Sequence, residues 1–274
     1  MYDIVCSLVI YNNNKFQVLE AIKSFLNTEL NIKLFLIDNS PTDILKDLKI
    51  DKRVEYLHNP SNPGYGSSHN IAIKKYCDKT KFHLILNPDI YYDRGVVEGI
   101  IEFMNYNDAI GLVMPKILYP NGQIQHLAKL IPNPYIFFVR RFVPIPSLQK
   151  KISDKFELRF SGYNNIMEAP YLSGCFMLFR TEVLKEIGGF DENIFMHMED
   201  LDICRRCNEK GFKTIFYPKQ FVYHDHLFKS FMTFSNLKMY FKSAFYYFNK
   251  WGWIFDRRRD EININVIKKI NNIN

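Results

Sequence analysis

The first 114 residues alternate between short apolar runs and stretches in which apolar residues recur at helical spacing. Continuous apolar runs are typical of strands buried on both faces, and they predict strands over Ile4–Ile10, Lys33–Ile37, Val54–Leu57, Phe82–Leu86 and Ile110–Met114. The periodic stretches predict helices over 18–26, 67–76 and 95–104. This alternation predicts an α/β protein with a doubly wound, mostly parallel sheet flanked by helices.

The second half of the chain is less regular. Prolines at 132, 134, 144 and 146 interrupt residues 127–165, which predicts an irregular insertion or lid with one or two short helices. Residues 169–179 return to strand character around Ser173-Gly174. Further helices are predicted over 181–187 and 199–210, and further strands over 213–217 and 221–223.

Polar residues directly follow four of the predicted strands. They are Tyr11-Asn12, Asp38-Asn39-Ser40, His58-Asn59 and Asn87-Pro88-Asp89. Because the carboxyl ends of parallel strands form the ligand crevice of such sheets, we expect these residues to share one binding site. Neither a Walker sequence nor G-x-G-x-x-G is present, which disfavours P-loop and dinucleotide-binding folds.

Three carboxylates, Glu199, Asp200 and Asp202, lie within four residues at the start of a predicted helix. Apolar residues surround them, and a buried carboxylate is costly unless a cation, a proton or a ligand compensates it. The run is therefore a candidate site. The alternative is an acid-rich helix start that the helix dipole favours, with Asp202 paired to Arg205 or Arg206.

Asp89 is a single acid at the end of an apolar run. It is either a turn or helix-capping residue or a ligand for Mg²⁺, which often takes one or two carboxylates besides substrate phosphates. Taken with the acid run at 199–202, Asp89 favours a metal-assisted, base-catalysed transferase.

Two further motifs have competing explanations. The Gly-containing stretch 59–70 opens a predicted helix and fits either turn chemistry or an anion site. Cys204-x-x-Cys207 followed by His224-x-His226 has the composition of a zinc site. We reject zinc because both cysteines lie within an amphipathic helix and the two histidines are too closely spaced.

Taken in order, these motifs resemble the inverting family 2 glycosyltransferases of the GT-A fold. The nearest likeness is to the bacterial rhamnosyltransferases that build O-antigens and other surface polysaccharides. The resemblance covers residues 3–226, and residues 1–226 would form the glycosyltransferase domain. Besides the strand-end motifs it includes Asn62-Pro63-Gly64-Tyr65-Gly66, Asn70, Ser173-Gly174-Cys175-Phe176-Met177, Gly188-Gly189-Phe190-Asp191-Glu192, Phe195–Arg206, Gly211-Phe212, Pro218 and His224.

The resemblance implies a donor site and a metal site. Asp38 would hydrogen-bond the pyrimidine base of a nucleotide-sugar donor. The donor site would be completed by Tyr11, Asn12, Asn39, Gly64, Tyr65, Asn70 and Asn87. Asn87-Pro88-Asp89 stands at the family's D-x-D position, and only Asp89 keeps an acid there. His224 stands at the family's third metal contact, so Asp89 and His224 would hold Mg²⁺ or Mn²⁺.

The resemblance also implies the reaction. Asp200 would be the catalytic base, while Glu199, Ser173 and Gly174 would hold the acceptor. The enzyme would move L-rhamnose from dTDP-rhamnose onto a lipid-diphosphate-linked saccharide in polysaccharide or O-antigen biosynthesis. Another donor on the same machinery, such as UDP-galactofuranose, UDP-glucose or a UDP-N-acetylhexosamine, is the first alternative.

Composition bears on the compartment. No apolar run approaches the roughly 20 residues of a membrane-spanning helix, and the N-terminus lacks the basic region of a secretory signal. Five cysteines, an odd number without a framework pattern, fit a reducing cytosol. We therefore expect a cytoplasmic enzyme.

Residues 227–274 form a basic, aromatic tail. They hold nine Lys or Arg and three acids, nearly the whole excess behind the net charge of +7. An aromatic stripe at helical spacing precedes Trp251, Trp253 and Arg257–Arg259. The tail is either a helix pair docked on the enzyme or on a second copy, forming a homodimer, or an interfacial anchor on the anionic inner face of the cell membrane. Nucleic-acid binding through the tail is disfavoured, because the acids at the strand ends would repel phosphate unless metal is bound.

Overall fold

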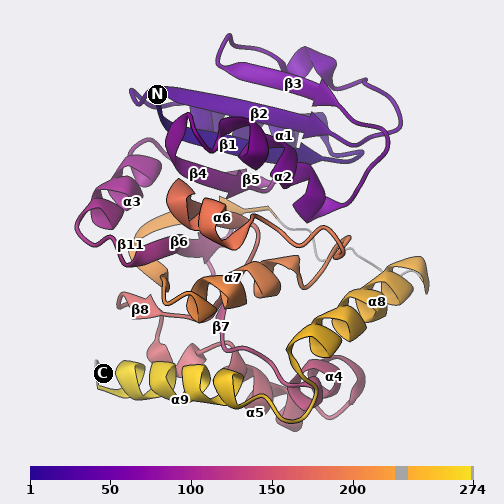
Figure 1. Ribbon diagram of the computed structural model, residues 1–274, viewed down its shortest axis with the longest axis vertical. Coiled ribbons are helices and arrows are strands. Elements are labelled where there is room, and N and C mark those ends of the chain that lie inside the picture. Colours follow the sequence, from indigo (N-terminus) through magenta and orange to yellow (C-terminus); the bar gives the residue numbers. More distant parts are fainter. Residues whose placement is uncertain (226–233, 273–274) are drawn as a thin grey trace.

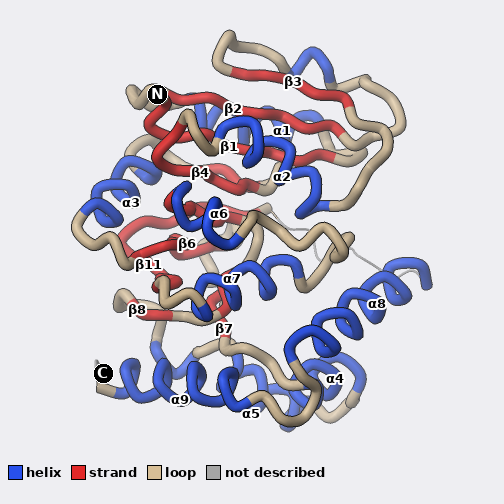
Figure 2. Tube along the Cα trace, in the orientation of Figure 1, coloured by secondary structure: helices blue, strands red, loops and turns tan. Residues whose placement is uncertain are grey.

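A nine-stranded mixed sheet forms the centre of the computed structural model, which describes residues 1–225 and 234–272 (Figure 1 and Figure 2). The strand order is β3-β2-β1-β4-β10-β6-β11-β5, with β8 paired to β11. The strands are β1 (Tyr2–Ile10), β2 (Ile32–Asp38), β3 (Val54–His58), β4 (Thr80–Leu86), β5 (Ile90–Tyr91), β6 (Ile110–Leu118), β8 (Met167–Glu168), β10 (Phe176–Arg180) and β11 (Lys213–His224). A separate two-stranded sheet pairs β7 (Ala128–Lys129) with β9 (Tyr171–Leu172).

The parallel pairing of β3, β2, β1 and β4 confirms the α/β prediction. In β1, Leu8 lies opposite Leu36 of β2 and Leu86 of β4, and residues 4–10 are buried on both faces. Burial on both faces explains why these strands are continuous apolar runs. All five strands predicted in the first 114 residues are present.

Different helices cover the two faces of β1. Ile4 and Leu8 belong to the same apolar cluster as residues of α1, whereas Val5 and Val9 belong to a cluster with Ala72 of α2. The helices are α1 (Lys15–Leu26), α2 (Tyr65–Tyr76), α3 (Val96–Asn105), α4 (Pro134–Phe142), α5 (Pro146–Phe156), α6 (Thr181–Ile187), α7 (Glu199–Glu209), α8 (Phe234–Trp251) and α9 (Arg257–Asn271), with short 3₁₀ turns η1 (Lys46–Leu48) and η2 (Arg159–Ser161).

Two strand predictions need correction. The segment 169–179 is not one strand: a turn at residues 173–175 separates β9 from β10, and β10 enters the sheet antiparallel between β4 and β6. The two strands predicted at 213–217 and 221–223 are one strand, β11, with a shift in register between Tyr217 and Phe221. A bulge of this kind breaks the apolar pattern without ending the strand.

The lower part of the molecule in Figure 1 consists of the 127–165 insertion and the C-terminal helices. The insertion forms α4 and α5, as predicted. Phe137 of α4 shares a second apolar cluster with Leu201 of α7 and with Ala244 and Phe248 of α8. The tail therefore packs on the enzyme through the buried half of its aromatic stripe. Within the described residues, no helix is long and apolar enough to cross a membrane.

Candidate active site

The loops that follow β1, β2 and β3 are joined by hydrogen bonds at one edge of the sheet. The Asn12 amide nitrogen donates to Ser40 Oγ (2.9 Å), and the Asn59 amide nitrogen donates to the Asp38 carbonyl oxygen (2.7 Å). Asn39 Nδ2 donates to Ser68 Oγ of α2 (2.7 Å). The strand-end residues thus meet at one edge, as the sequence predicts for parallel strands.

Asp38 is fully buried at this edge. One carboxylate oxygen accepts the Ser40 amide (2.9 Å), and the other accepts the Tyr56 hydroxyl (2.7 Å). In this arrangement the carboxylate fixes the β2 loop, and its expected contact with a nucleobase stays a prediction. Tyr11 is half exposed beside it, at 52%.

Tyr65, at the start of α2, connects three of the predicted motifs. Its hydroxyl lies 2.9 Å from Asn87 Oδ1 and 2.8 Å from the Gly174 carbonyl oxygen. Burial raises the pKa of this phenol, so Tyr65 stays a hydrogen-bond donor. The tyrosine therefore holds the β4 loop against the turn at 173–175.

Gly64 and Asn70 position α2. Gly64 has φ +101°, and a Cβ there would lie 2.4 Å from the Phe195 carbonyl oxygen, so only glycine fits. Asn70 Oδ1 accepts the Phe190 amide (2.8 Å), and Asn70 Nδ2 donates to the Phe190 carbonyl oxygen (2.9 Å). Asn70 thus binds the 188–192 loop with both ends of its amide, and donor contact by Asn70 stays a prediction.

Asp200 lies in the first turn of α7, facing the turn at 173–175. Its Oδ2 accepts the Gly174 amide (3.1 Å) and the Tyr171 hydroxyl (3.2 Å). The preceding residues His197 and Met198 have φ of +65° and +72°, which is strained backbone for non-glycine residues. The structure therefore brings Asp200, Gly174 and Tyr65 together, as the sequence predicted for the first two.

Glu199 is buried beside Asp200, at 7% exposure, and its Oε2 has no hydrogen-bond partner among the described residues. Burial raises the pKa of Glu199, and the negative charge of Asp200 raises it further. Two adjacent acids in different environments suit different tasks, because the buried one keeps its proton more readily.

Asp89 and His224 also come together, from the loop after β4 and from the end of β11. Asp89 Oδ1 lies 3.3 Å from His224 Nε2. Gln125 holds the histidine from behind: its Nε2 donates to the His224 carbonyl oxygen, and its Oε1 lies 2.9 Å from His224 Nδ1. Since the Gln125 oxygen is an acceptor, Nδ1 carries a proton.

A carboxylate oxygen and an imidazole nitrogen this close need a proton or a cation between them. The donor set of one carboxylate and one histidine, with the far ring nitrogen hydrogen-bonded, fits a divalent ion. Across the described ranges 1–225 and 234–272, no three His, Cys, Asp or Glu side chains converge on one point. Within those ranges, Asp89 and His224 are therefore a two-ligand candidate site.

The structure gives no support to a zinc site that combines His224 with Cys204 and Cys207. Cys204 and Cys207 are fully buried within α7, and Cys204 Sγ donates to the Leu172 carbonyl oxygen (3.5 Å). His226 lies outside the described residues. Both cysteines thus lie inside a helix, as the sequence predicts, and the rejection of zinc stays a prediction.

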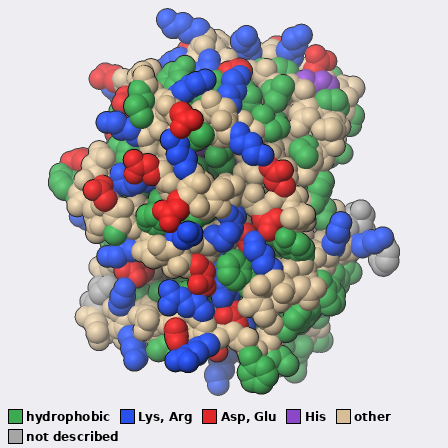
Figure 3. Space-filling model, in the orientation of Figure 1, with side chains coloured by type: hydrophobic (Ala, Val, Ile, Leu, Met, Phe, Trp, Pro, Cys, Tyr) green, Lys and Arg blue, Asp and Glu red, His purple; other side chains and the backbone are tan. Residues whose placement is uncertain are grey.

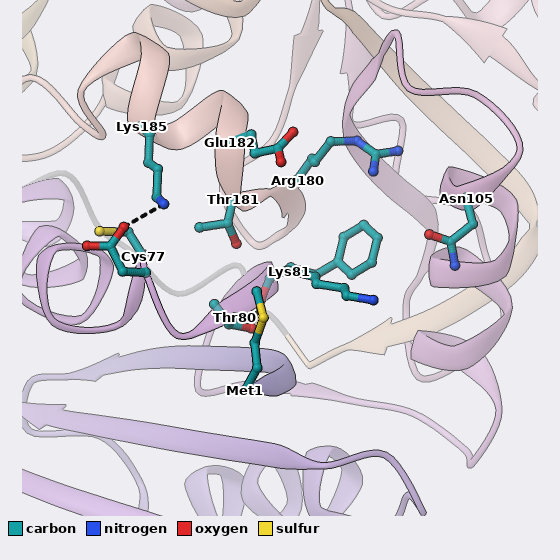
Figure 4. Close-up of a pocket in the computed structure, with 11 residues that line it drawn as sticks. Met1, Cys77, Thr80, Lys81, Asn105, Arg180, Thr181, Glu182 and Lys185 are labelled. Carbon is teal, nitrogen blue, oxygen red and sulfur yellow. Dashed lines mark hydrogen bonds and ion pairs between the residues drawn. The ribbon is translucent and has the colours of Figure 1, made fainter.

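A pocket of about 270 Å³ lies at the opposite end of the sheet (Figure 4). Met1 and Thr80 line it from the starts of β1 and β4, and Thr181 and Lys185 line it from α6. Lys185 forms an ion pair with Asp78, with Nζ 2.6 Å from Oδ1. None of the predicted site residues lines this pocket, so it is separate from the strand-end site.

The C-terminal helices hold α7 in place. Asp202, which has no exposed surface, accepts from Arg206 Nε, Lys250 Nζ and Trp251 Nε1, each at 2.8 Å. This confirms the predicted pairing of Asp202 with Arg206. Arg205 and Asp256 form a buried two-point ion pair (2.5 and 2.7 Å), and Arg205 lies over the Trp251 ring at 4.5 Å.

Several residues that shape this site carry no recognisable signal in the sequence. Gln125 lies in an unremarkable polar stretch, and Tyr171 reads as an ordinary strand residue. Lys250, Trp251 and Asp256 lie in the basic, aromatic tail, whose composition does not indicate contact with α7. One signal was available for the last group: a single acid, Asp256, directly precedes the Arg257–Arg259 run, where it caps α9.

Comparison with known proteins places the chain among sugar-transferring enzymes. The family model "Glycosyltransferase like family 2" matches residues 9–244. An N-acetylglucosaminyl-diphospho-decaprenol L-rhamnosyltransferase of Mycobacterium tuberculosis is 24% identical over 221 residues, covering 73% of this chain and 68% of that protein. Rhamnosyltransferase WbbL of Escherichia coli is 24% identical over 212 residues, covering 73% of this chain and 75% of that protein.

Among solved structures, that of GalNAc-T7 with UDP, GalNAc and Mn²⁺ superposes with a TM-score of 0.66 at 16% identity. The match covers 89% of this chain and 48% of that one, so the chain spans about half the length of that protein. The likeness shows the fold, and it confirms the GT-A architecture expected from the sequence.

Proposed function

The chain belongs to the glycosyltransferase-like family 2, and on this premise we propose that it transfers L-rhamnose from a nucleoside diphosphate sugar to a lipid-linked saccharide, with inversion. The observation that carries the proposal is the arrangement around Asp200. This carboxylate faces the turn at 173–175, which Tyr65 links to the loop bearing Asp89. A base and a candidate cation site thus lie on two sides of one shared turn.

Asp200 would act as the base. The Gly174 amide and the Tyr171 hydroxyl donate to its carboxylate and hold it toward the turn at 173–175, where it would accept the proton of an acceptor hydroxyl. Attack by that hydroxyl breaks the bond between the sugar and the diphosphate in a single displacement, which inverts the anomeric centre. Glu199, which keeps its proton more readily, would donate a hydrogen bond to the acceptor beside Ser173 and Gly174.

Asp89 and His224 would hold Mg²⁺ or Mn²⁺. The GalNAc-T7 structure contains Mn²⁺, which supports a divalent ion of this kind here. When bound, the ion would neutralise charge on the leaving diphosphate. Gln125 fixes the ring of His224, and Asn87 together with Tyr65 fixes the loop that precedes Asp89.

The remaining donor contacts are proposed from their position at the strand ends. The proposed donor residues lie at the carboxyl ends of the strands or support the loops there: Tyr11, Asn12, Asp38, Asn39, Gly64, Asn70 and Asn87. Rhamnose is favoured because two relatives are named as rhamnosyltransferases. The name of the M. tuberculosis relative includes a diphospho-decaprenol carrier, which supports a lipid-linked acceptor, such as an O-antigen precursor, for this chain. Another nucleotide sugar would use the same side chains.

The domain division is also a proposal. Residues 1–226 would carry donor and acceptor sites, and residues 227–274 would keep the enzyme as a peripheral protein on the anionic inner face of the membrane. A homodimer contact through the same residues is the alternative, and no nucleic-acid partner is proposed.

The test is a screen of nucleotide sugars followed by a base variant. Thermal shift with dTDP-rhamnose and the UDP sugars, in Mn²⁺ and in EDTA, identifies the donor through the stability that a bound ligand adds. Asp200→Asn should then keep donor binding and lower kcat by about 100-fold or more, the usual scale for loss of a general base.

Asp108→Asn is the matched control, because Asp108 is 96% exposed and lies away from the site. NMR of the product should show an inverted anomeric centre. Near wild-type turnover in Asp200→Asn, or retention at the anomeric carbon, would refute the assignment of Asp200.

A further inference from the structure

The turn between α8 and α9 presents two apolar side chains to solvent. Ile254 is 76% exposed and Phe255 is 94% exposed. The turn is firmly held: the Gly252 amide donates to the Phe248 carbonyl oxygen (2.8 Å), and the Trp253 ring packs 5.2 Å from the Phe248 ring. Adjacent exposed apolar residues on a fixed turn indicate a contact surface, because such patches are otherwise kept small.

The outer face of α8 continues this surface. Lys238, Lys242 and Phe245 are exposed and recur at three- and four-residue spacing, so they share one side of the helix. The Phe245 ring lies 5.1 Å from that of Trp253, which joins the helix face to the turn. On its other edge, Phe241 of α8 stacks on Phe142 of α4 (5.4 Å), which is 43% exposed.

The charge on this face is positive. Residues 234–251 contain no Asp or Glu, and neither Lys238 nor Lys242 forms an ion pair with a described residue. The Arg257–Arg259 run, expected to contact lipid, contributes less than the lysines. Arg259 is buried, and Arg257 pairs with Glu261 at 2.9 Å.

Figure 3 shows hydrophobic side chains gathered along the lower right edge of the molecule, over the region where Figure 1 places α4 and α8. We name this surface the docking face and define it by Phe142, Lys238, Lys242, Phe245, Ile254 and Phe255. We propose that it binds an anionic lipid surface, with Ile254 and Phe255 inserted among the acyl chains and the two lysines at the headgroups.

The combination of aromatic and basic residues on one face is typical of helices that lie in the plane of a membrane interface. A second copy of the chain is a poorer occupant, because its docking face would bring the same positive charge. Of the aromatic stripe identified in the sequence, Phe245 belongs to the docking face. Ala244 and Phe248 from that stripe are buried inside the protein.

The docking face is rigidly connected to the catalytic helix. On one side of the turn, Lys250 and Trp251 bind Asp202 of α7; on the other side, Asp256 binds Arg205 of α7. Asp200 lies on the same helix, so lipid contact fixes the height of the base above the membrane. This consequence rests on the proposed function, in which the acceptor is carried by a lipid.

Vesicle co-sedimentation of the full chain tests the proposal. The probes are vesicles of phosphatidylcholine alone and of phosphatidylcholine with an equal part of phosphatidylglycerol. The change is Ile254→Ser with Phe255→Ser, and the matched control is Ile44→Ser with Phe16→Ser, since those residues are 74% and 77% exposed elsewhere on the molecule. The test pair should weaken binding to the mixed vesicles by about tenfold or more, and the control pair should not.

A second pair isolates charge. Lys238→Glu with Lys242→Glu should weaken binding to the mixed vesicles by about fivefold or more per residue, and most at low salt. Lys49→Glu with Lys52→Glu makes the same change of net charge on another surface and should have little effect. Melting curves confirm that each variant is folded, since all eight side chains are exposed.

Equal loss in test and control pairs would overturn the proposal. A dimer on a sizing column that the Ile254/Phe255 variant converts to monomer would also overturn it, in favour of a protein contact. Transfer to a short water-soluble acceptor should be unchanged in the Ile254/Phe255 variant. Failure of transfer with every donor, alongside intact vesicle binding, would refute the proposed function and leave the docking face standing.

Discussion

Replacement of Asp256 should destabilise the whole protein, because Asp256 anchors α7 through Arg205. Asp256 is 5% exposed as a side chain and Arg205 is 3% exposed, so their ion pair is shielded from water. Burial alone would raise the pKa of Asp256, but hydrogen bonds from Arg205 and from the Arg259 amide more than offset this and lower it. Breaking such a pair by removing one partner costs about 3–5 kcal/mol, because the other charge stays buried.

Two variants of Asp256 separate the cost of losing the ion pair from the cost of losing the N-cap of α9. Asp256→Asn keeps an acceptor for the Arg259 amide and therefore keeps the N-cap of α9, but it removes the charge that faces Arg205. Asp256→Ala removes both. We expect a loss of about 3 kcal/mol in the free energy of unfolding for Asp256→Asn and about 1 kcal/mol more for Asp256→Ala. For a chain of this size the first loss corresponds to about 6–12 °C in Tm.

Urea unfolding measures both losses, and the pair Arg257–Glu261 supplies the control. It lies on the same helix, but its side chains are 94% and 44% exposed, so Glu261→Gln should cost no more than about 0.5 kcal/mol. The advantage of wild type over Asp256→Asn should disappear as the pH falls through the lowered pKa of Asp256, because stability from a depressed carboxyl pKa is lost in acid. An unfolding free energy of Asp256→Asn within about 0.5 kcal/mol of wild type would refute the argument.

Two further predictions concern the site. Gln125→Leu should weaken nucleotide binding in the presence of Mn²⁺ by about 10–100-fold, as measured by calorimetry, because Gln125 holds the ring of His224. Nucleotide affinity in EDTA should not change, and the exposed control Gln123→Leu should bind like wild type. If Gln125→Leu and wild type bound the nucleotide equally well in Mn²⁺, a role for His224 in metal binding would be refuted. Gly64→Ala should lower the free energy of unfolding by more than the control Gly95→Ala. Both glycines have positive φ, but of the two only Gly64 has an atom within 4 Å of the added methyl group. Equal losses of stability in the two variants would show that the contact with Phe195 is unimportant.

The first half of the sheet is predictable because its constraint is local. A strand such as β1 is buried on both faces, so every residue from 4 to 10 must be compatible with burial, and the run is visible in the sequence. The position of β10 is not predictable in this way. Its apolar residues fit a parallel or an antiparallel place in the sheet equally well, and the choice depends on β4 and β6, which are far away in the chain.

The site shows the same division. Asp89 and Asp200 can be recognised in the sequence as candidate site residues, because an acid next to apolar residues is unusual. Gln125 cannot be recognised in this way, since its role depends on the 2.9 Å distance from its Oε1 to Nδ1 of His224, which lies 99 residues later in the chain. The C-terminal contacts with Asp202 are equally non-local, and an aromatic residue such as Trp251 has the same helical spacing whether it faces lipid or protein.

The sequence of Glu199, Asp200 and Asp202 does not indicate which of the three carboxyl groups is neutral in the folded protein. Unfolding measurements on Glu199 test this directly. Burial, aided by the charge of Asp200, raises the pKa of Glu199 in the folded protein, whereas in the unfolded chain the group titrates near its ordinary value. The folded state then retains a proton that the unfolded state releases. The associated stability is present below the unfolded pKa and is lost as the pH rises through the folded pKa.

Glu199→Gln removes this titration and keeps the shape of the side chain. The variant should therefore gain stability relative to wild type as the pH rises from about 5 to about 8, by about 1.4 kcal/mol for each pH unit between the unfolded and the folded pKa of Glu199. Urea unfolding at several pH values measures the difference, with the exposed Glu182→Gln as the control. A difference between Glu199→Gln and wild type that does not change with pH would mean that Glu199 is ionised in the folded protein. In that case Glu199 could not donate a hydrogen bond to an acceptor sugar, and the division of labour with Asp200 would have to be abandoned.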